Sequence, residues 1–137
     1  MRYTVAMLRV VACLWALGAL FCAGAQTRKQ TRGPDIEVAQ FHAQRTGGDV
    51  AIDGKIKNAG ERTHNGVVLL FDFLATGNQV ITTKKSVLEV AQFAPGAETE
   101  FNVRVVDPVR AVWIRVRATD RQDRELRVAK DGPFTIE

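Results

Sequence analysis

Residue types that carry chemistry are scarce in this chain of 137 residues, which has two cysteines, two histidines and one tyrosine. Ser86 is the only serine. A serine nucleophile needs an adjacent base, and no Gly-x-Ser-x-Gly elbow surrounds Ser86. A Ser-Lys dyad with Lys84 is the weaker alternative, because lysines on an edge strand usually only discourage pairing with other strands. We therefore expect no catalytic residues.

Metal and cofactor sites are also not expected. His42 and His64 are isolated from each other and have no cysteine near them, which does not match the ligand spacing of a zinc site. The acidic run from Asp120 to Glu125 contains Arg121 and Arg124, which neutralise the charge that calcium requires. The sequence predicts a charged turn there instead.

The first 25 residues indicate export. Arg2 and Arg9 give a basic start, residues 10–25 carry no charge, and Ala23-Gly24-Ala25 has small residues where signal peptidase cleaves. We expect a signal peptide over residues 1–25. An uncleaved anchor is disfavoured because a spanning helix needs about 20 apolar residues, whereas the uncharged run over residues 10–25 has only 16. Acylation of Cys22 is disfavoured because Phe21 occupies a position where a small residue is expected.

Removal of this segment would leave a product without cysteine, because Cys13 and Cys22 both lie within it. Such a product can form no disulfide. None of the four asparagines after residue 25 has serine or threonine two places on, so the N-glycosylation signal is missing. These features fit a bacterial envelope, and we expect a periplasmic or extracellular protein with no membrane span after cleavage.

The basic character of the chain is concentrated near its start. Its calculated pI is about 9.4, but only 14 basic residues face 15 acidic ones from Asp35 onward. We expect residues 26–34 to form a disordered basic leader and residues 35–137 to form one domain. A nearly neutral domain lacks the positive stripe that a nucleic-acid surface needs, so no nucleic-acid partner is expected.

From Asp35 onward the hydrophobic period is two, which is typical of strands. Turn signals divide the pattern at Thr46–Asp49, Asn58–Gly60, Thr76–Asn78, Ala94–Gly96 and Asp107-Pro108. Residues 80–90 also fit a short helix, but Lys84 and Lys85 favour an edge strand. We expect about seven strands in an all-β, immunoglobulin-like antiparallel β-sandwich. The predicted strands comprise one opened by Ile36, Val38 and Phe41, followed by 50–57, 67–74, 80–90, 101–105, 112–118 and one containing Leu126 and Val128.

The alternation also predicts the core and the last hairpin. If Ile114, Val116 and Leu126 share one face, even-numbered residues of one strand must lie opposite even-numbered residues of the other. The two residue numbers of every directly opposed pair then add up to an even number. We prefer a loop over Asp120–Gln122 that places Arg117 opposite Glu125; moving the loop by one residue places Arg117 opposite Arg127. The core is expected to contain Ile52, Ile56, Phe71, Phe101, Val103, Ile114 and Val116.

Three short motifs resemble a known family. They are Gly54-x-Ile56-x-Asn58, Val67-x-Leu69-x-Phe71 before a glycine turn, and Ala94-Pro95-Gly96 ahead of a strand. Over residues 50–105 the chain resembles the FxLYD-type and related uncharacterised immunoglobulin-like domains of bacterial exported proteins. It has Ala75-Thr76-Gly77 where that family has Tyr-Asp before glycine. The resemblance implies a fold and a compartment, and it brings no catalytic residues.

One strand face suggests a function. Alternation places Trp113, Arg115 and Arg117 opposite the predicted core side of their strand, and Arg104 and Arg127 have matching outward parity. Tryptophan and arginine are enriched at binding hot spots. We expect a non-catalytic module that binds an envelope protein or serves a structural role. An envelope subunit that binds an anionic ligand or assists assembly, and a hydrolase with an unrecognised site, are the alternatives. The alternative for the face itself is structural: residues 133–136 cover Trp113, and the arginines pair with local acids.

Signal cleavage after Ala25 predicts a mature chain that begins at Gln26 and is soluble. Intact-mass measurement of protein recovered from the exported fraction tests this prediction. Recovery of residues 1–25 on the protein in the membrane fraction would contradict it.

Overall fold

The computed structural model describes residues 33–137, so the expected signal peptide and residues 26–32 of the expected leader lie outside the described residues. The described part is all β and contains no helix. Nine strands are formed, two more than predicted. They are β1 (Ile36–Thr46), β2 (Asp49–Asn58), β3 (Val68–Leu74), β4 (Val80–Val87), β5 (Glu98–Val106), β6 (Trp113–Thr119), β7 (Glu125–Leu126), β8 (Val128–Ala129) and β9 (Phe134–Thr135).

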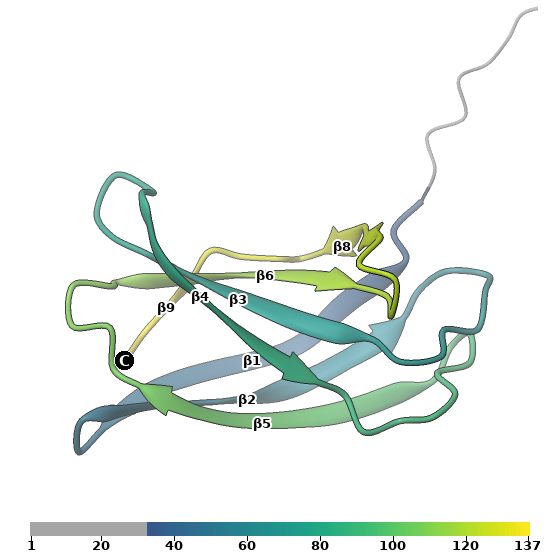
Figure 1. Cartoon of the computed structure of the whole chain (residues 1–137), viewed down its shortest axis with the longest axis horizontal. Helices are drawn as coiled ribbons and strands as arrows, with labels where there is room; N and C mark the ends of the chain where they lie inside the picture. Colours follow the sequence, from purple (N-terminus) through teal and green to yellow (C-terminus); the bar gives the residue numbers. More distant parts are fainter. Residues whose placement is uncertain (1–32) are drawn as a thin grey trace, which may run out of the picture. The chain divides into compact units, whose positions relative to one another are not determined.

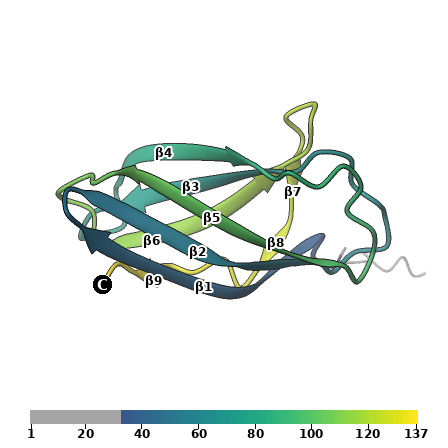
Figure 2. The same ribbon diagram turned by 90° about the horizontal axis from the view of Figure 1, so that it is seen from below.

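The strands form two sheets that pack face to face (Figures 1 and 2). One sheet has the order β5-β2-β1-β8, and the other has the order β4-β3-β6-β7 with β9 also paired to β6. The first, second and fifth strands thus lie in one sheet and the third, sixth and seventh in the other, consistent with an immunoglobulin-like sandwich. The predicted fold class is confirmed, although β1 and β8 pair in parallel over two residues.

The first hairpin forms where the glycine pair predicts it. β1 and β2 run antiparallel from Ile36 opposite Asn58 to Thr46 opposite Asp49. Gly47 and Gly48 both have positive φ, at 57° and 90°, which is the requirement of a type I′ turn between two strands. The turn therefore fixes the register that sends Val50, Ile52 and Ile56 inward.

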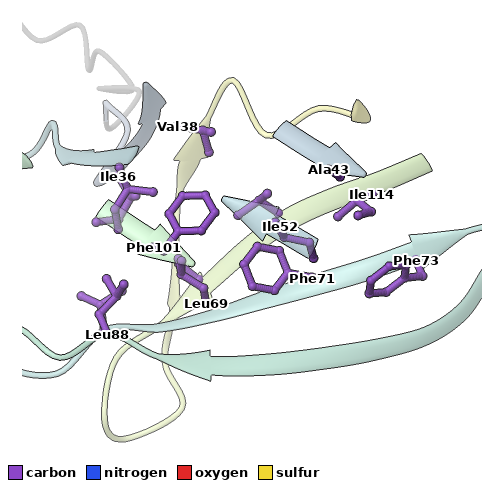
Figure 3. Packing of buried hydrophobic residues seen from close by; sticks show 14 of the residues in the cluster. Ile36, Val38, Ala43, Ile52, Leu69, Phe71, Phe73, Leu88, Phe101 and Ile114 are labelled. Atoms are coloured by element: carbon purple, nitrogen blue, oxygen red, sulfur yellow. The ribbon is translucent and has the colours of Figure 1, made fainter. Parts of the chain in front are cut away.

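The core lies between the sheets, and alternate strand residues of the kind that the hydrophobic period predicts form most of it (Figure 3). Val67, Leu88, Phe93, Ala111 and Ile136 complete it from outside the strands. Six of the seven predicted core residues are buried. Val103 is only partly buried, because β5 is the outermost strand of its sheet and pairs only with β2. The largest fully buried side chains of this core are Phe71, Phe73, Phe93, Ile36, Ile52, Ile56 and Leu69.

Gly54 allows aromatic rings to close over the middle of the first sheet. It lies directly opposite Phe41 on one side and Phe101 on the other. A Cβ at this position would lie 2.7 Å from Cζ of Phe101 and would collide with the carbonyl oxygen of Gln40. The ring of Phe101 lies 5.8 Å from that of Phe71 in the opposite sheet. Glycine here lets Phe101 reach across the core.

Residues 80–90 form an edge strand, as predicted, but β4 ends at Val87. After it, Leu88 turns inward, is 7% exposed and donates its N–H to the carbonyl of Val67 at 2.9 Å.

The prediction that Leu126 and Val128 share one strand is wrong. Leu126 belongs to β7 and pairs with β6, whereas Val128 belongs to β8 and pairs with β1. The chain crosses between the sheets at Arg127, whose carbonyl accepts hydrogen bonds from the N–H groups of Asp35 and Ile36 at 2.9 and 3.0 Å. These partners are distant in sequence, so local alternation does not reveal the crossing.

The parity argument for the last hairpin is confirmed, but the preferred register is wrong. Ala118 lies opposite Leu126 and Thr119 opposite Glu125, which is the alternative with the loop moved by one residue. Asp120 determines this register, because its carboxylate accepts the N–H groups of Gln122 and Arg124 at 2.8 and 2.9 Å. This local capping outweighs the cross-strand charge pair that favoured the other register.

Residues 134–137 form a seam that joins both sheets. β9 pairs with the start of β6, and Ile136, which is 7% exposed, donates its N–H to the carbonyl of Val112. Glu137 instead bonds to β1, donating to Ala43 and accepting from Arg45 at 2.9 and 2.8 Å. The structural alternative for Trp113 placed residues 133–136 beside it, whereas no local pattern predicted the bonds between Glu137 and β1, which is distant in the sequence.

Replacing Phe101 tests the aromatic contact across the core. We expect Phe101→Ala to lower the free energy of unfolding by about 3–5 kcal/mol, through lost burial and the cavity left behind. Val109→Ala is the control, because Val109 is 81% exposed and its loss should change stability by less than about 0.5 kcal/mol. Urea denaturation measures both, and a loss below about 1 kcal/mol for Phe101→Ala would contradict the assignment.

Candidate binding surface

The central strand of the second sheet is buried on both faces. β3 directs Leu69, Phe71 and Phe73 into the core, while Leu70, Asp72 and Leu74 have the opposite parity and are nevertheless only 6%, 6% and 0% exposed. The outer side of a strand in a two-layer sandwich normally meets water. Neighbouring side chains on β4 and β6 must therefore cover these three residues. We call this side of β4, β3 and β6 the outer surface.

Trp113, Arg115 and Arg117 line the outer surface along β6. They lie directly opposite Leu74, Asp72 and Leu70, respectively, and all three are half-buried. Ile114 and Val116 point the other way and are fully buried. The predicted common face of the tryptophan and the two arginines is therefore present.

Asp72 is the polar centre of this surface. Its carboxylate accepts Nε and Nη2 of Arg117 at 2.6 and 2.9 Å and the hydroxyl of Thr83 at 2.7 Å. Burial raises the pKa of Asp72, but the hydrogen bonds from Arg117 and Thr83 and the charges of Arg117 and Arg115 outweigh it and hold that pKa below its usual value. The residue is ionised at neutral pH and fixes Arg117 against the sheet.

Arg115 differs from Arg117 in this respect. It lies opposite Asp72 in the ladder, and its charge helps to lower the pKa of Asp72. Among residues 33–137 it makes no ion pair. Lys85, which faces Leu70 from β4, is exposed and likewise has no ion pair in the described part. The outer surface thus carries positive charge beyond what Asp72 neutralises.

The two other arginines of the predicted surface lie elsewhere. Arg104 is on β5 in the opposite sheet and does not adjoin this face; its guanidinium lies 3.8 Å from the carboxylate of Asp49. Arg127 is exposed at the crossing between β7 and β8, where its N–H donates to Oδ2 of Asp35 at 2.9 Å. It extends neither β7 nor β8.

The seam extends the sheet beside Trp113. Thr135 pairs directly with Trp113, and Phe134 pairs with Ile114. Because opposed residues share a face, Thr135 stands next to the indole on the outer side while Phe134 turns into the core and stacks on Phe41, with 4.2 Å between ring centroids. Trp113 keeps an intermediate exposure.

The outer side of the other sheet has a different chemistry. Charges of opposite sign stand opposite each other across its strands, with Lys57 between Glu37 and Glu98. Lys55 similarly faces Glu100, and Lys130 lies 2.9 Å from Glu37. By contrast, the edge strand β4 exposes Val80, Ile81 and Val87 by 53%, 39% and 66%. The two faces of the sandwich are therefore chemically unequal.

The residues considered for catalysis do not come together. Ser86 lies opposite Leu69 on β4, and within the described part of the chain its hydroxyl has no hydrogen bond to a histidine, lysine or carboxylate. His64 forms an isolated bridge with Phe93, and its Nε2 atom is buried without a partner. Residues 33–137 contain no group of three histidine, cysteine or acidic residues arranged to hold a metal ion.

His42 contacts two carboxylates at the seam. Its Nε2 lies 2.8 Å from Oε2 of Glu137, and its Nδ1 lies 3.5 Å from Oδ1 of Asp53. These hydrogen bonds, to Glu137 first and then to Asp53, raise the pKa of His42. No local sequence pattern indicates this cluster, because Glu137 is 95 residues away from His42.

Comparison with known proteins adds information about the fold. No family model matches the chain, and no curated protein matches it. It is similar to part of Bacteroides uniformis beta-glucuronidase 2 covalently bound to cyclophellitol-6-carboxylate aziridine, with 11% identity, a TM-score of 0.50 and coverage of 68% of this chain and 13% of that chain. A calcium-binding mutant of the same protein gives 14% identity, a TM-score of 0.49 and coverage of 69% and 14%.

A beta-glucosidase from Kluyveromyces marxianus in complex with glucose gives 14% identity, a TM-score of 0.36 and coverage of 77% of this chain and 14% of that chain. The chain thus spans a small part of each of these solved structures, and the likeness concerns the fold alone. Separately, the described residues include no helix long and apolar enough to cross a membrane.

The raised pKa of His42 predicts a pH-dependent stability of the seam. Protonated His42 contributes fully below its ordinary pKa of about 6.5, and this contribution is lost as the pH rises through the higher value of the folded state. His42→Gln should remove that part of the profile. Urea midpoints of both proteins from about pH 5 to about pH 9 measure the difference. Parallel profiles would show that the cluster does not stabilise the seam.

Proposed function

We propose that this chain is an exported, non-catalytic β-sandwich module that binds a protein of the bacterial envelope through its outer surface. The observation that carries the proposal is the inequality of the two faces. The β1-β2-β5 side is polar with charges of opposite sign opposed across its strands. The β4-β3-β6 side combines Trp113, exposed apolar residues of β4 and Arg115, which forms no ion pair within residues 33–137. The export part of the proposal rests on residues 1–25 and on the absence of cysteine after Cys22.

The chemistry of the outer surface suits a protein partner. A half-buried tryptophan offers a large apolar area with little rotamer entropy to lose, and arginine binds carboxylates with two parallel hydrogen bonds. Asp72 already engages Arg117, which leaves Arg115 and Lys85 for acidic groups of the partner. We infer a partner surface with an apolar centre and acidic residues around it.

The surplus positive charge also favours a second candidate. An envelope subunit that binds an anionic ligand, or that assists assembly of a complex, would use the same Arg115 and Lys85. Trp113 and the exposed valines and isoleucine of β4 would have no role in binding a small anion, so the protein partner is the better explanation. No observation in the described residues favours a hydrolase.

A photo-crosslinking amino acid placed on each face tests the proposal in the native envelope. Incorporated at Lys85, on the outer surface, it should give one dominant crosslinked protein; at Asn102, exposed on β5 of the opposite sheet, it should not. A Trp113→Ala, Arg115→Ala double variant should keep its fold and lose that protein in co-purification, with a loss of binding of at least about tenfold.

Two further variants serve as controls. Lys55→Ala, Glu100→Ala changes a matched charge pair on the opposite sheet and should leave co-purification unchanged. Arg117→Ala should instead lower stability by about 1–3 kcal/mol, because the buried Asp72 would lose both hydrogen bonds from Arg117 and keep only the one from Thr83. A folded double variant that still recovers the partner would contradict the proposal, and equal crosslinking from both faces would also do so.

A further inference from the structure

A groove of about 280 Å³ opens where β3 begins and β4 ends. It is lined by Gly66, Val68, Val87, Leu88, Glu89, Val90, Ala91 and Arg121. Val68 and Val87 are opposed across β3 and β4 on the outer side, so the groove continues the outer surface at the end away from Trp113. Its floor is aliphatic, and its only charged lining residues are Arg121 and Glu89.

Arg121 is laid into this groove by its contact with Gly66. A Cβ at Gly66 would lie 2.7 and 2.9 Å from Cγ and Cδ of Arg121, so the arginine stem passes directly over the glycine backbone. Gly66 is buried although it lies in a loop, and its φ of 94° also favours glycine. The hairpin that carries Arg121 is held by the hydrogen bonds to Asp120. The guanidinium is thus positioned by two separate loops.

The charge of Arg121 is available to a ligand. Within residues 33–137 it forms no ion pair and no side-chain hydrogen bond, although Glu89 lines the same groove. The two charges are therefore separated by more than the 4.0 Å of an ion pair. A second negative charge near Glu89 would be repelled, so the groove favours a ligand with one negative charge over a phosphate group.

We propose that this groove binds the carboxyl terminus of a peptide that ends in an aliphatic residue. Arg121 receives the terminal carboxylate through parallel N–H···O hydrogen bonds, and Val68, Val87 and Val90 contact the last side chain. The volume lies near the lower limit for small-molecule sites, which suits one or two side chains. The groove shares Val87 with the outer surface, but its contact at Arg121 lies away from Trp113 and Arg115 and does not depend on that proposal.

Two fluorescein-labelled peptides of sequence Gly-Ser-Gly-Ser-Val-Leu test the proposal, one with a free carboxyl terminus and one with an amide. Fluorescence anisotropy with the chain from residue 26 to 137 should show binding of the acid at least about tenfold tighter than that of the amide, the usual scale of one charge-assisted contact. Because this comparison uses the unaltered protein, it does not depend on the folding of any variant.

Substitutions then assign the contact to its residues. Arg121→Gln should reduce the affinity for the acid to that for the amide, Arg121→Lys should recover part of it, and Val87→Ser should weaken both peptides. Arg110→Gln is the matched control, because Arg110 is also exposed and without an ion pair in the described part.

Equal binding of acid and amide, an unchanged affinity in Arg121→Gln, or no saturable binding of the acid would each overturn the proposal. Unchanged peptide binding in the Trp113→Ala, Arg115→Ala variant is expected and separates this site from the outer-surface contact.

Discussion

The packing of aromatic rings between the two sheets is the contact on which this sandwich depends. Phe71 on β3 and Phe101 on β5 belong to different sheets, and their ring centroids lie 5.8 Å apart. Residues 33–137 contain no cysteine, so no disulfide links the sheets there and the apolar contact must do so. The bare backbone of Gly54 makes room for the Phe101 ring. The position of β3, and hence of the outer surface, follows from this contact.

Hydrophobic alternation in the sequence was enough to predict the two-sheet architecture. Residues 50–57 and 112–118 alternate cleanly, and the glycine pair at positions 47 and 48 defines its hairpin without help from other parts of the chain. Local alternation could not predict what happens after Leu126. The crossing at Arg127, the parallel pairing of β8 and the seam all depend on hydrogen bonds to β1 and β6 that are distant in sequence. The register of the last hairpin depended on the Asp120 cap, which is local and could have been read from the spacing of its loop.

Strand alternation also predicted part of the candidate site. Strand parity places Trp113, Arg115 and Arg117 together, but it does not reveal that Asp72 engages Arg117. Asp72 stands within the apolar run of β3, and an acidic residue in such a run signals a cationic neighbour on the adjacent strand. The groove at Arg121 has no comparable signal, because its residues come from the start of β3, the end of β4 and the loop after β6, which are separate in the sequence. Gly66 becomes meaningful only when the path of the Arg121 side chain is known.

The seam and the crossing at Arg127 have a consequence for the order of folding. His42 and Glu137 are separated by 95 residues, and Asp35 and Arg127 by 92. Contacts of such long separation carry a large loop-closure entropy and are typical of slowly folding β-proteins. The β1-β2 hairpin can form early through its glycine turn. β1 can pair with β8 and bond to Glu137 only after the C-terminal part of the domain has folded against it. The pairing of β8 with β1 in one sheet and of β9 with β6 in the other therefore forms late in folding, and both sheets are completed together.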